Sequence, residues 1–197
     1  MDSDDTLRDF PGRDRLIAAI DDAVSLGECV AITHRLRHNL CALMRSGDVE
    51  LPASIHQSLP GHYARRELHR SAEHGYALVA MTWGPGQGTP IHDHDGMWCV
   101  EGVWSGQLEI VQYDLNRREG DLYGFTEVGT LIAGTGSAGS LIPPHEYHAI
   151  RNASDRDIAV SLHVYAQPMT RCGVFMETAS GDGFQRVEKE LSLDAAA

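Results

Sequence analysis

The sequence predicts a mainly β protein: a jelly-roll or β-barrel preceded by two or three α-helices. Residues 1–60 carry apolar side chains at helical spacing, whereas residues 61–185 carry short apolar runs separated by Gly, Pro, Asn and Asp clusters. No helical pattern interrupts those runs, which favours an antiparallel barrel over a parallel sheet. A chain of 197 residues is long enough for one hydrophobic core, so we expect a single domain covering residues 1–197.

The helical part extends from Asp14 to about Leu59. Its apolar residues recur every three or four positions, which indicates amphipathic helices. They are Leu16, Ile17, Ile20 and Val24, followed by Val30, Ile32, Leu36, Leu40 and Leu43. The predicted strands are His62–His69, Tyr76–Trp83, Met97–Val103, Leu108–Leu115, Gly129–Ile132, Gly139–Ile142, His148–Asn152 and Ile158–Tyr165.

The composition argues against several classes of partner. The chain has 28 acidic and 16 basic residues, a net charge of -12, which repels nucleic-acid phosphates and anionic lipids. It shows no signal-peptide pattern and no apolar stretch approaching the roughly 20 residues that cross a bilayer. We therefore expect a cytoplasmic protein that binds neither nucleic acid nor membrane.

Its four cysteines are widely spaced, which suggests neither a zinc clip nor a disulfide framework. We expect disorder only in the tail, Asp194 to Ala197; the oligomeric state is left open.

The densest chemical signal is the pair His92 and His94. Side chains two apart on a strand share a face, so both imidazoles would point into the barrel. His148 is the candidate for a third ligand. Imidazole is a common ligand of iron, zinc, copper and nickel, and three such ligands leave positions open for substrate. The sequence therefore predicts a three-histidine metal centre.

A second polar row lies in the last predicted strand. Its apolar residues face one way, whereas Ser161, His163 and Tyr165 share the other face. Ser161 would hold His163, and His163 would orient the Tyr165 phenol, as outer groups do around a metal site. A serine hydrolase is not indicated, because Ser161 lacks the glycines of a nucleophile elbow and the third group is no carboxylate.

These residues resemble known motifs. The run from Gly86 to Gly106, with His-x-His after five intervening residues, resembles the first cupin motif, and the stretch around His148 and Asn152 resembles the second. Two positions depart from the cupin pattern. Cys99 replaces the usual glutamate ligand, and His145 replaces a glycine, which makes it a competing ligand candidate.

The cysteine at the glutamate position makes the resemblance to the cysteine dioxygenase family specific. In animal members this cysteine forms a thioether with the tyrosine of a Ser-x-His-x-Tyr run, here Tyr165, which lies 17 residues after His148. The resemblance implies Fe(II) on the three histidines, with L-cysteine and O2 converted to cysteine sulfinate. Ser161, His163, Tyr165 and Cys99 would support the reaction. The family also has a Tyr-x-Arg run, here Tyr63 and Arg65, whose arginine binds the substrate carboxylate.

Several alternatives stay open. Relatives with glutamine at the Arg65 position favour 3-mercaptopropionate, and Arg171 is a candidate contact for a carboxylate, including the second one of mercaptosuccinate. Cys172 matches a family cysteine near the pocket mouth, although a small buried apolar role suits it better. Arg66 should point outward to solvent. A zinc or nickel cupin, or a metal-binding or ligand-sensing cupin without catalysis, uses the same histidines.

Overall fold

The computed structural model describes residues 9–195 and begins with a helical segment. Helix α1 covers Arg13–Val24, helix α2 covers Cys29–Ser46, and a single 3-10 turn covers Ala53–His56. Glu28 caps α2, because its carboxylate accepts a hydrogen bond from the backbone N–H of Ala31 at 3.0 Å. Gly47 ends the same helix in the left-handed conformation, with φ of 70°. No helix of residues 9–195 is long and apolar enough to span a bilayer.

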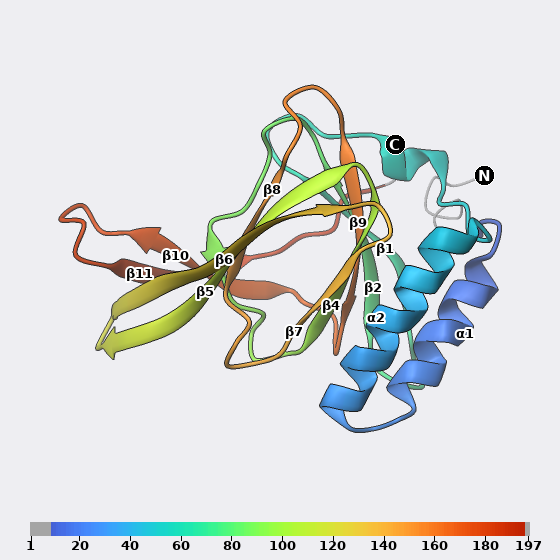
Figure 1. Cartoon of the computed structure of the whole chain (residues 1–197), viewed down its shortest axis with the longest axis horizontal. Helices are drawn as coiled ribbons and strands as arrows, with labels where there is room; N and C mark the ends of the chain where they lie inside the picture. The colour runs from blue at the N-terminus through green and yellow to red at the C-terminus, as the bar shows by residue number, and fades with distance from the viewer. Residues whose placement is uncertain (1–8, 196–197) are drawn as a thin grey trace.

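The strands form two antiparallel sheets. They are β1 Ala64–Arg70, β2 Ala77–Trp83, β3 Ile91–His92, β4 Cys99–Ser105, β5 Gln107–Glu119, β6 Leu122–Gly134, β7 Ala138–Leu141, β8 His148–Asn152, β9 Ala159–Tyr165, β10 Arg171–Glu177 and β11 Phe184–Glu190. One sheet has the order β1-β2-β9-β4-β7, and the other closes on itself in the order β10-β11-β6-β5-β8-β3. The hairpins β5–β6 and β10–β11 extend away from the helices (Figure 1). The structure thus confirms a mainly β barrel preceded by two helices.

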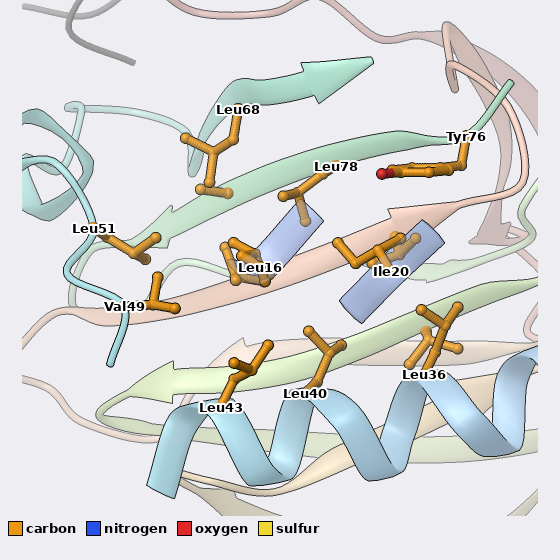
Figure 2. Close-up of a cluster of buried hydrophobic side chains, with 14 of the residues drawn as sticks. Leu16, Ile20, Leu36, Leu40, Leu43, Val49, Leu51, Leu68, Tyr76 and Leu78 are labelled. Atoms are coloured by element: carbon orange, nitrogen blue, oxygen red, sulfur yellow. The ribbon is translucent and has the colours of Figure 1, made fainter. Parts of the chain in front are cut away.

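The helices lie side by side against the outer face of the first sheet (Figure 1). Figure 2 shows Leu36 and Leu40 of α2 pointing toward Leu16 and Ile20 of α1, with Leu78 of β2 beyond them. The three helical leucines are at most 1% exposed. Tyr76 adds a polar link, because its hydroxyl donates to the Asp21 carboxylate at 2.8 Å. The apolar periodicity of the first 60 residues therefore exists to cover this sheet.

Strands β2 and β9 are buried along their whole length. On β9 the alternation separates two cores: Val160, Leu162 and Val164 pack against the helices, and the intervening side chains face the barrel interior. Because β9 pairs with both β2 and β4, the polar row faces inward in the middle of the sheet.

Five expectations need correction. Strands β10 and β11 were not predicted, and the barrel continues past residue 185 to Glu190. The β5–β6 hairpin is longer than expected. Arg66 is fully buried rather than outward in solvent: its guanidinium donates to Thr82 Oγ1 at 3.3 Å and to the carbonyl of Gln57 at 3.0 Å. Asp194 is ordered, since its carboxylate accepts from the Arg65 backbone N–H at 2.8 Å; residues 196–197 of the tail lie outside the described residues.

Candidate metal centre and substrate pocket

Three imidazoles converge at one place between the sheets. His92 ends β3 and pairs in register with His148, the first residue of β8; His94 is the second residue after β3. One ligand atom from each histidine lies within 4.8 Å of the other two. In residues 9–195, this group contains no carboxylate or thiol. The predicted ligand set is therefore assembled, although His94 lies beyond the end of the strand that it was expected to share with His92.

The chemistry of these rings suits a transition metal. His92 Nδ1 lies 3.1 Å from the carbonyl of Pro90, which leaves Nε2 free as an electron-pair donor. Burial lowers the pKa of His94 and His148 well below the usual value, so both rings stay neutral. Neutral nitrogen donors with open positions beside them fit a divalent ion of the iron, zinc or copper kind. His145, the competing candidate, is exposed, lies 3.7 Å from Asp114 and is outside the group.

The polar row of β9 is buried beside the histidines. Ser161 Oγ lies 2.8 Å from His163 Nε2 and accepts a hydrogen bond from Trp83 Nε1 at 2.9 Å. The His163 ring stacks on Tyr165 at 5.9 Å between centroids. No hydrogen bond links these two rings in the described structure, so they contact each other by ring packing. Burial lowers the pKa of His163 to about 3, so it is neutral.

Cys99 and Tyr165 lie directly opposite each other on paired strands, β4 and β9. Both side chains are buried, and burial raises the pKa of each well above its usual value. Cβ atoms of directly opposed residues are about 4.5–5.5 Å apart, within reach of a bond from sulfur to an aromatic ring. The Tyr165 ring is also near the histidines, 6.3 Å from the His94 ring.

Two of the predicted substrate contacts, Tyr63 and Arg65, line a small cavity beside His92. Its volume is about 20 Å³ and its walls are Tyr63, Arg65, Met81, Trp83, Thr89, His92, Ile150, His163, Tyr165, Met169, Cys172 and Leu191. The Arg65 guanidinium donates to the carbonyls of Ser192 at 3.0 Å and Met169 at 3.2 Å. Tyr63 stacks on Trp83 with centroids 4.5 Å apart. Arg171 does not line this cavity; it lies on the surface and pairs with Asp95 at 3.0 Å.

Sequence reasoning missed three contributors. Trp83 holds Ser161, and Asp93 anchors the segment between the histidines by accepting from Gly173 N at 2.7 Å and Arg186 Nε at 2.9 Å. Glu101 lies between the two sheets, and burial raises its pKa to about 8. Asp93 could have been found from the sequence, because it is the residue between the two candidate ligands His92 and His94. Trp83 and Glu101 face residues on other strands, and no local spacing in the sequence reveals which strands are neighbours.

The two sheets and the imidazole group between them define a protein of the cupin class with a three-histidine centre. The sequence pattern described as "Cysteine dioxygenase type I" matches residues 55–178, and the chain belongs to this family. The cysteine dioxygenase type 1 of Danio rerio is 29% identical over 100 residues, covering 51% of this chain and 49% of that protein. The Rattus norvegicus protein is 27% identical over the same shares. This chain thus spans about half the length of these relatives.

Among solved structures, a Thermus thermophilus protein is similar at 21% identity and a TM-score of 0.43, over 56% of this chain and 89% of that one. An oxalate oxidase bound to the substrate analogue glycolate is 19% identical with a TM-score of 0.42, over 56% of this chain and 53% of that one.

Proposed function

We propose that this chain is a thiol dioxygenase that converts L-cysteine and O2 to cysteine sulfinate with Fe(II) held by His92, His94 and His148. The observation that carries the proposal is the set of three neutral imidazoles, without a carboxylate, beside a cavity lined by Arg65 and Tyr165. Membership of the cysteine dioxygenase type I family supports the same reaction.

When bound, ferrous iron would lower the pKa of the substrate thiol and supply the redox chemistry toward dioxygen. Three uncharged ligands leave the charge of the ion unneutralised, which favours an anionic thiolate as the next ligand. Sulfur gains both oxygen atoms and gives up four electrons, while the thiol proton leaves. The substrate itself is therefore the reductant, and no organic cofactor is required.

Arg65 is suited to hold the substrate carboxylate. Two of its N–H groups donate to backbone carbonyls, which fixes the guanidinium at the cavity wall, and an arginine has five such donors. Its remaining donors can form a paired contact with a carboxylate. A cavity of about 20 Å³ holds about one water molecule, so cysteine enters only if neighbouring side chains such as Met169 and Leu191 move aside.

Tyr165 is suited to donate a hydrogen bond inside the pocket. Because burial raises the pKa of its phenol, the O–H group keeps its proton at neutral pH. The neutral ring of His163 stacks on the phenol, and Ser161 holds that ring from the other side. These residues would fix the direction of the O–H donor and keep water from the reacting sulfur.

An oxygen-electrode assay tests the activity. Iron-loaded protein should consume O2 with cysteine, and with 3-mercaptopropionate or mercaptosuccinate more slowly. The exposed ion pair of Arg171 supports this order, because that arginine is not in place to hold a second carboxylate. Absence of O2 uptake with all three thiols, despite bound iron, would contradict the proposal and leave a metal-binding cupin without catalysis.

The substitution Arg65→Gln tests the choice of thiol. Losing a charge-assisted contact of about 1.5–3 kcal/mol should lower kcat/KM for cysteine about 10- to 100-fold. The matched control is Arg70→Gln, on the same strand, where the arginine is exposed and paired with Glu67 at 2.8 Å. Steady-state kinetics should show the control unchanged; equal kinetics for Arg65→Gln would remove Arg65 from the site.

A further inference from the structure

Glu101 is a buried carboxyl group between two histidines of the site. It lies on β4, is 6% exposed and pairs in register with His163 of β9. Its Oε2 atom is 3.6 Å from His163 Nδ1, and its Oε1 atom is 3.7 Å from His148 Nδ1. One carboxyl group therefore faces a metal-ligand ring with one oxygen and the polar row with the other.

The facing atoms lack other partners. In the described part of the chain, Glu101 Oε2, His148 Nδ1 and His163 Nδ1 are buried without a hydrogen bond. Buried polar atoms without partners cost about 1–3 kcal/mol each, so such atoms are usually paired. The two separations, 3.6 Å and 3.7 Å, lie about half an ångström beyond the upper end of the N–H···O range. A small movement of the carboxyl group or of the rings would satisfy all three atoms.

The surrounding contacts decide where the protons lie. Ser161 Oγ accepts the Trp83 N–H, so its own hydroxyl proton is free to go to His163 Nε2, 2.8 Å away. The proton of the neutral His163 ring then lies on Nδ1 and points at Glu101. His148 Nε2 lies 3.1 Å from His92 Nε2, inside the ligand group, and once Nε2 binds a metal ion the His148 proton lies on Nδ1. Both N–H groups thus converge on the two oxygens of one carboxylate.

We propose that Glu101 is a positioning residue that accepts hydrogen bonds from Nδ1 of His148 and of His163 and so fixes the third ligand and the polar row together. The inference rests on the metal-binding part of the proposed function. A carboxylate behind a ligand imidazole sets the tautomer and orientation of the ring and makes it a stronger donor. A dication one ring away favours the ionised carboxyl group and opposes the effect of burial.

Metal affinity of the purified protein gives the first test, by competition for Co(II) against a chromophoric chelator. Glu101→Gln should bind Co(II) about 10- to 100-fold more weakly. The amide oxygen can accept from one of the two imidazole N–H groups, but the amide NH2 group is a donor and cannot pair with the other. The matched control is Glu109→Gln on β5, whose carboxylate is paired with Arg151 at 2.6 Å on the surface. The control should bind Co(II) as wild type does.

The second measurement separates positioning from packing. Proton NMR of the Co(II) protein detects the shifted, exchangeable Nδ1–H signals of the ligand histidines. Glu101→Gln should move or broaden one of these signals, that of His148, and Glu101→Asp should restore part of both the affinity and the signal. Should Glu101→Gln fail to fold, Glu101→Asp alone decides, with weakened binding and a moved signal expected.

Two outcomes have different meanings. A wild-type affinity and an unchanged NMR signal in the Glu101 variants would overturn the inference. That result would indicate that the carboxyl group serves instead the cavity of about 260 Å³ that Glu101 lines together with Leu108, Ile110 and Leu141. A wild-type protein that binds no Co(II) at all would overturn the metal centre itself, and this inference with it.

Discussion

Single residues of β9 and β4 acquire their roles from strand alternation. On β9, Val160, Leu162 and Val164 face the helices, so every second position is left to the interior. Tyr165 is the last of these inward positions, where it meets Cys99 of β4. The same alternation on β4 turns Cys99 and Glu101 to the same side, which places a thiol and a carboxyl group along one wall of the site.

A thioether between Cys99 and Tyr165 is the first consequence to test. Turnover with cysteine and O2 should give protein about 2 Da lighter than its sequence, because a carbon–sulfur bond replaces two bonds to hydrogen while O2 takes up the electrons. Intact-mass spectrometry measures the difference. Cys99→Ala should show no deficit, and Cys172→Ala, which removes a buried cysteine of the cavity that Tyr165 lines, should keep it. An unshifted wild-type mass after many turnovers contradicts the crosslink.

Local spacing was enough to predict some site residues and not others. Ser161 and His163 are two apart on β9, and the strand turns that spacing into a shared face. His92 and His94 have the same spacing and converge as predicted, although β3 ends at His92. Their meeting with His148 needed the resemblance to cupins, because no local pattern brings residues 92 and 148 together. Glu101 carries no such signal: only the pairing of β4 with β9 sets it against His163.

At the scale of elements, the N-terminal segment buries side chains that point outward from the barrel. Arg66 was expected in solvent because its neighbour Arg65 faces the cavity. The outer face at this point is instead covered by the chain around Gln57, which accepts from the Arg66 guanidinium. Strand β11 was missed for the opposite reason, because it is largely exposed and its apolar alternation is weak. Periodicity predicts which residues share a face but not what covers that face.

The contact between α2 and the sheet can be tested by one buried leucine. Leu36→Ala should lower the free energy of unfolding by about 2–5 kcal/mol, because Leu36 is fully buried between α2 and the sheet. Val30→Ala is the matched control on the same helix; Val30 is 61% exposed, so its loss should change stability by less than about 0.5 kcal/mol. Urea unfolding of both variants measures the difference. Equal values would show that the helix contributes little to the core.

Helix packing should not disturb the metal centre. The leucines of α2 contact the face of the sheet opposite to Ser161 and His163. Folded Leu36→Ala should therefore bind metal with wild-type affinity, although it unfolds at lower urea concentration.

At the scale of the whole molecule, the two sheets divide the site between them. The closed sheet supplies the candidate metal ligands from β3, β8 and the segment after β3, whereas the five-stranded sheet supplies Arg65, Cys99, Glu101 and the polar row. The predicted barrel places these parts in one domain. The boundary between the two sheets could not be predicted from the sequence, because it depends on which strands pair. The core beneath the helices lies on the opposite face of the five-stranded sheet from the site.

This division predicts a fold that does not depend on the metal. Because a separate apolar core covers the outer face of one sheet, the chelated protein should keep its circular dichroism spectrum. Metal that binds only the folded state then adds stability, about 2.7 kcal/mol at a hundredfold excess over Kd. For a domain of this size, Tm should rise by roughly 5–10 °C in a thermal scan under nitrogen with Fe(II). His94→Gln should abolish the rise, whereas His38→Gln, on the exposed face of α2, should retain it. A chelated protein that is unfolded, or a wild-type Tm indifferent to iron, would show that barrel and metal centre are not built as two separable parts.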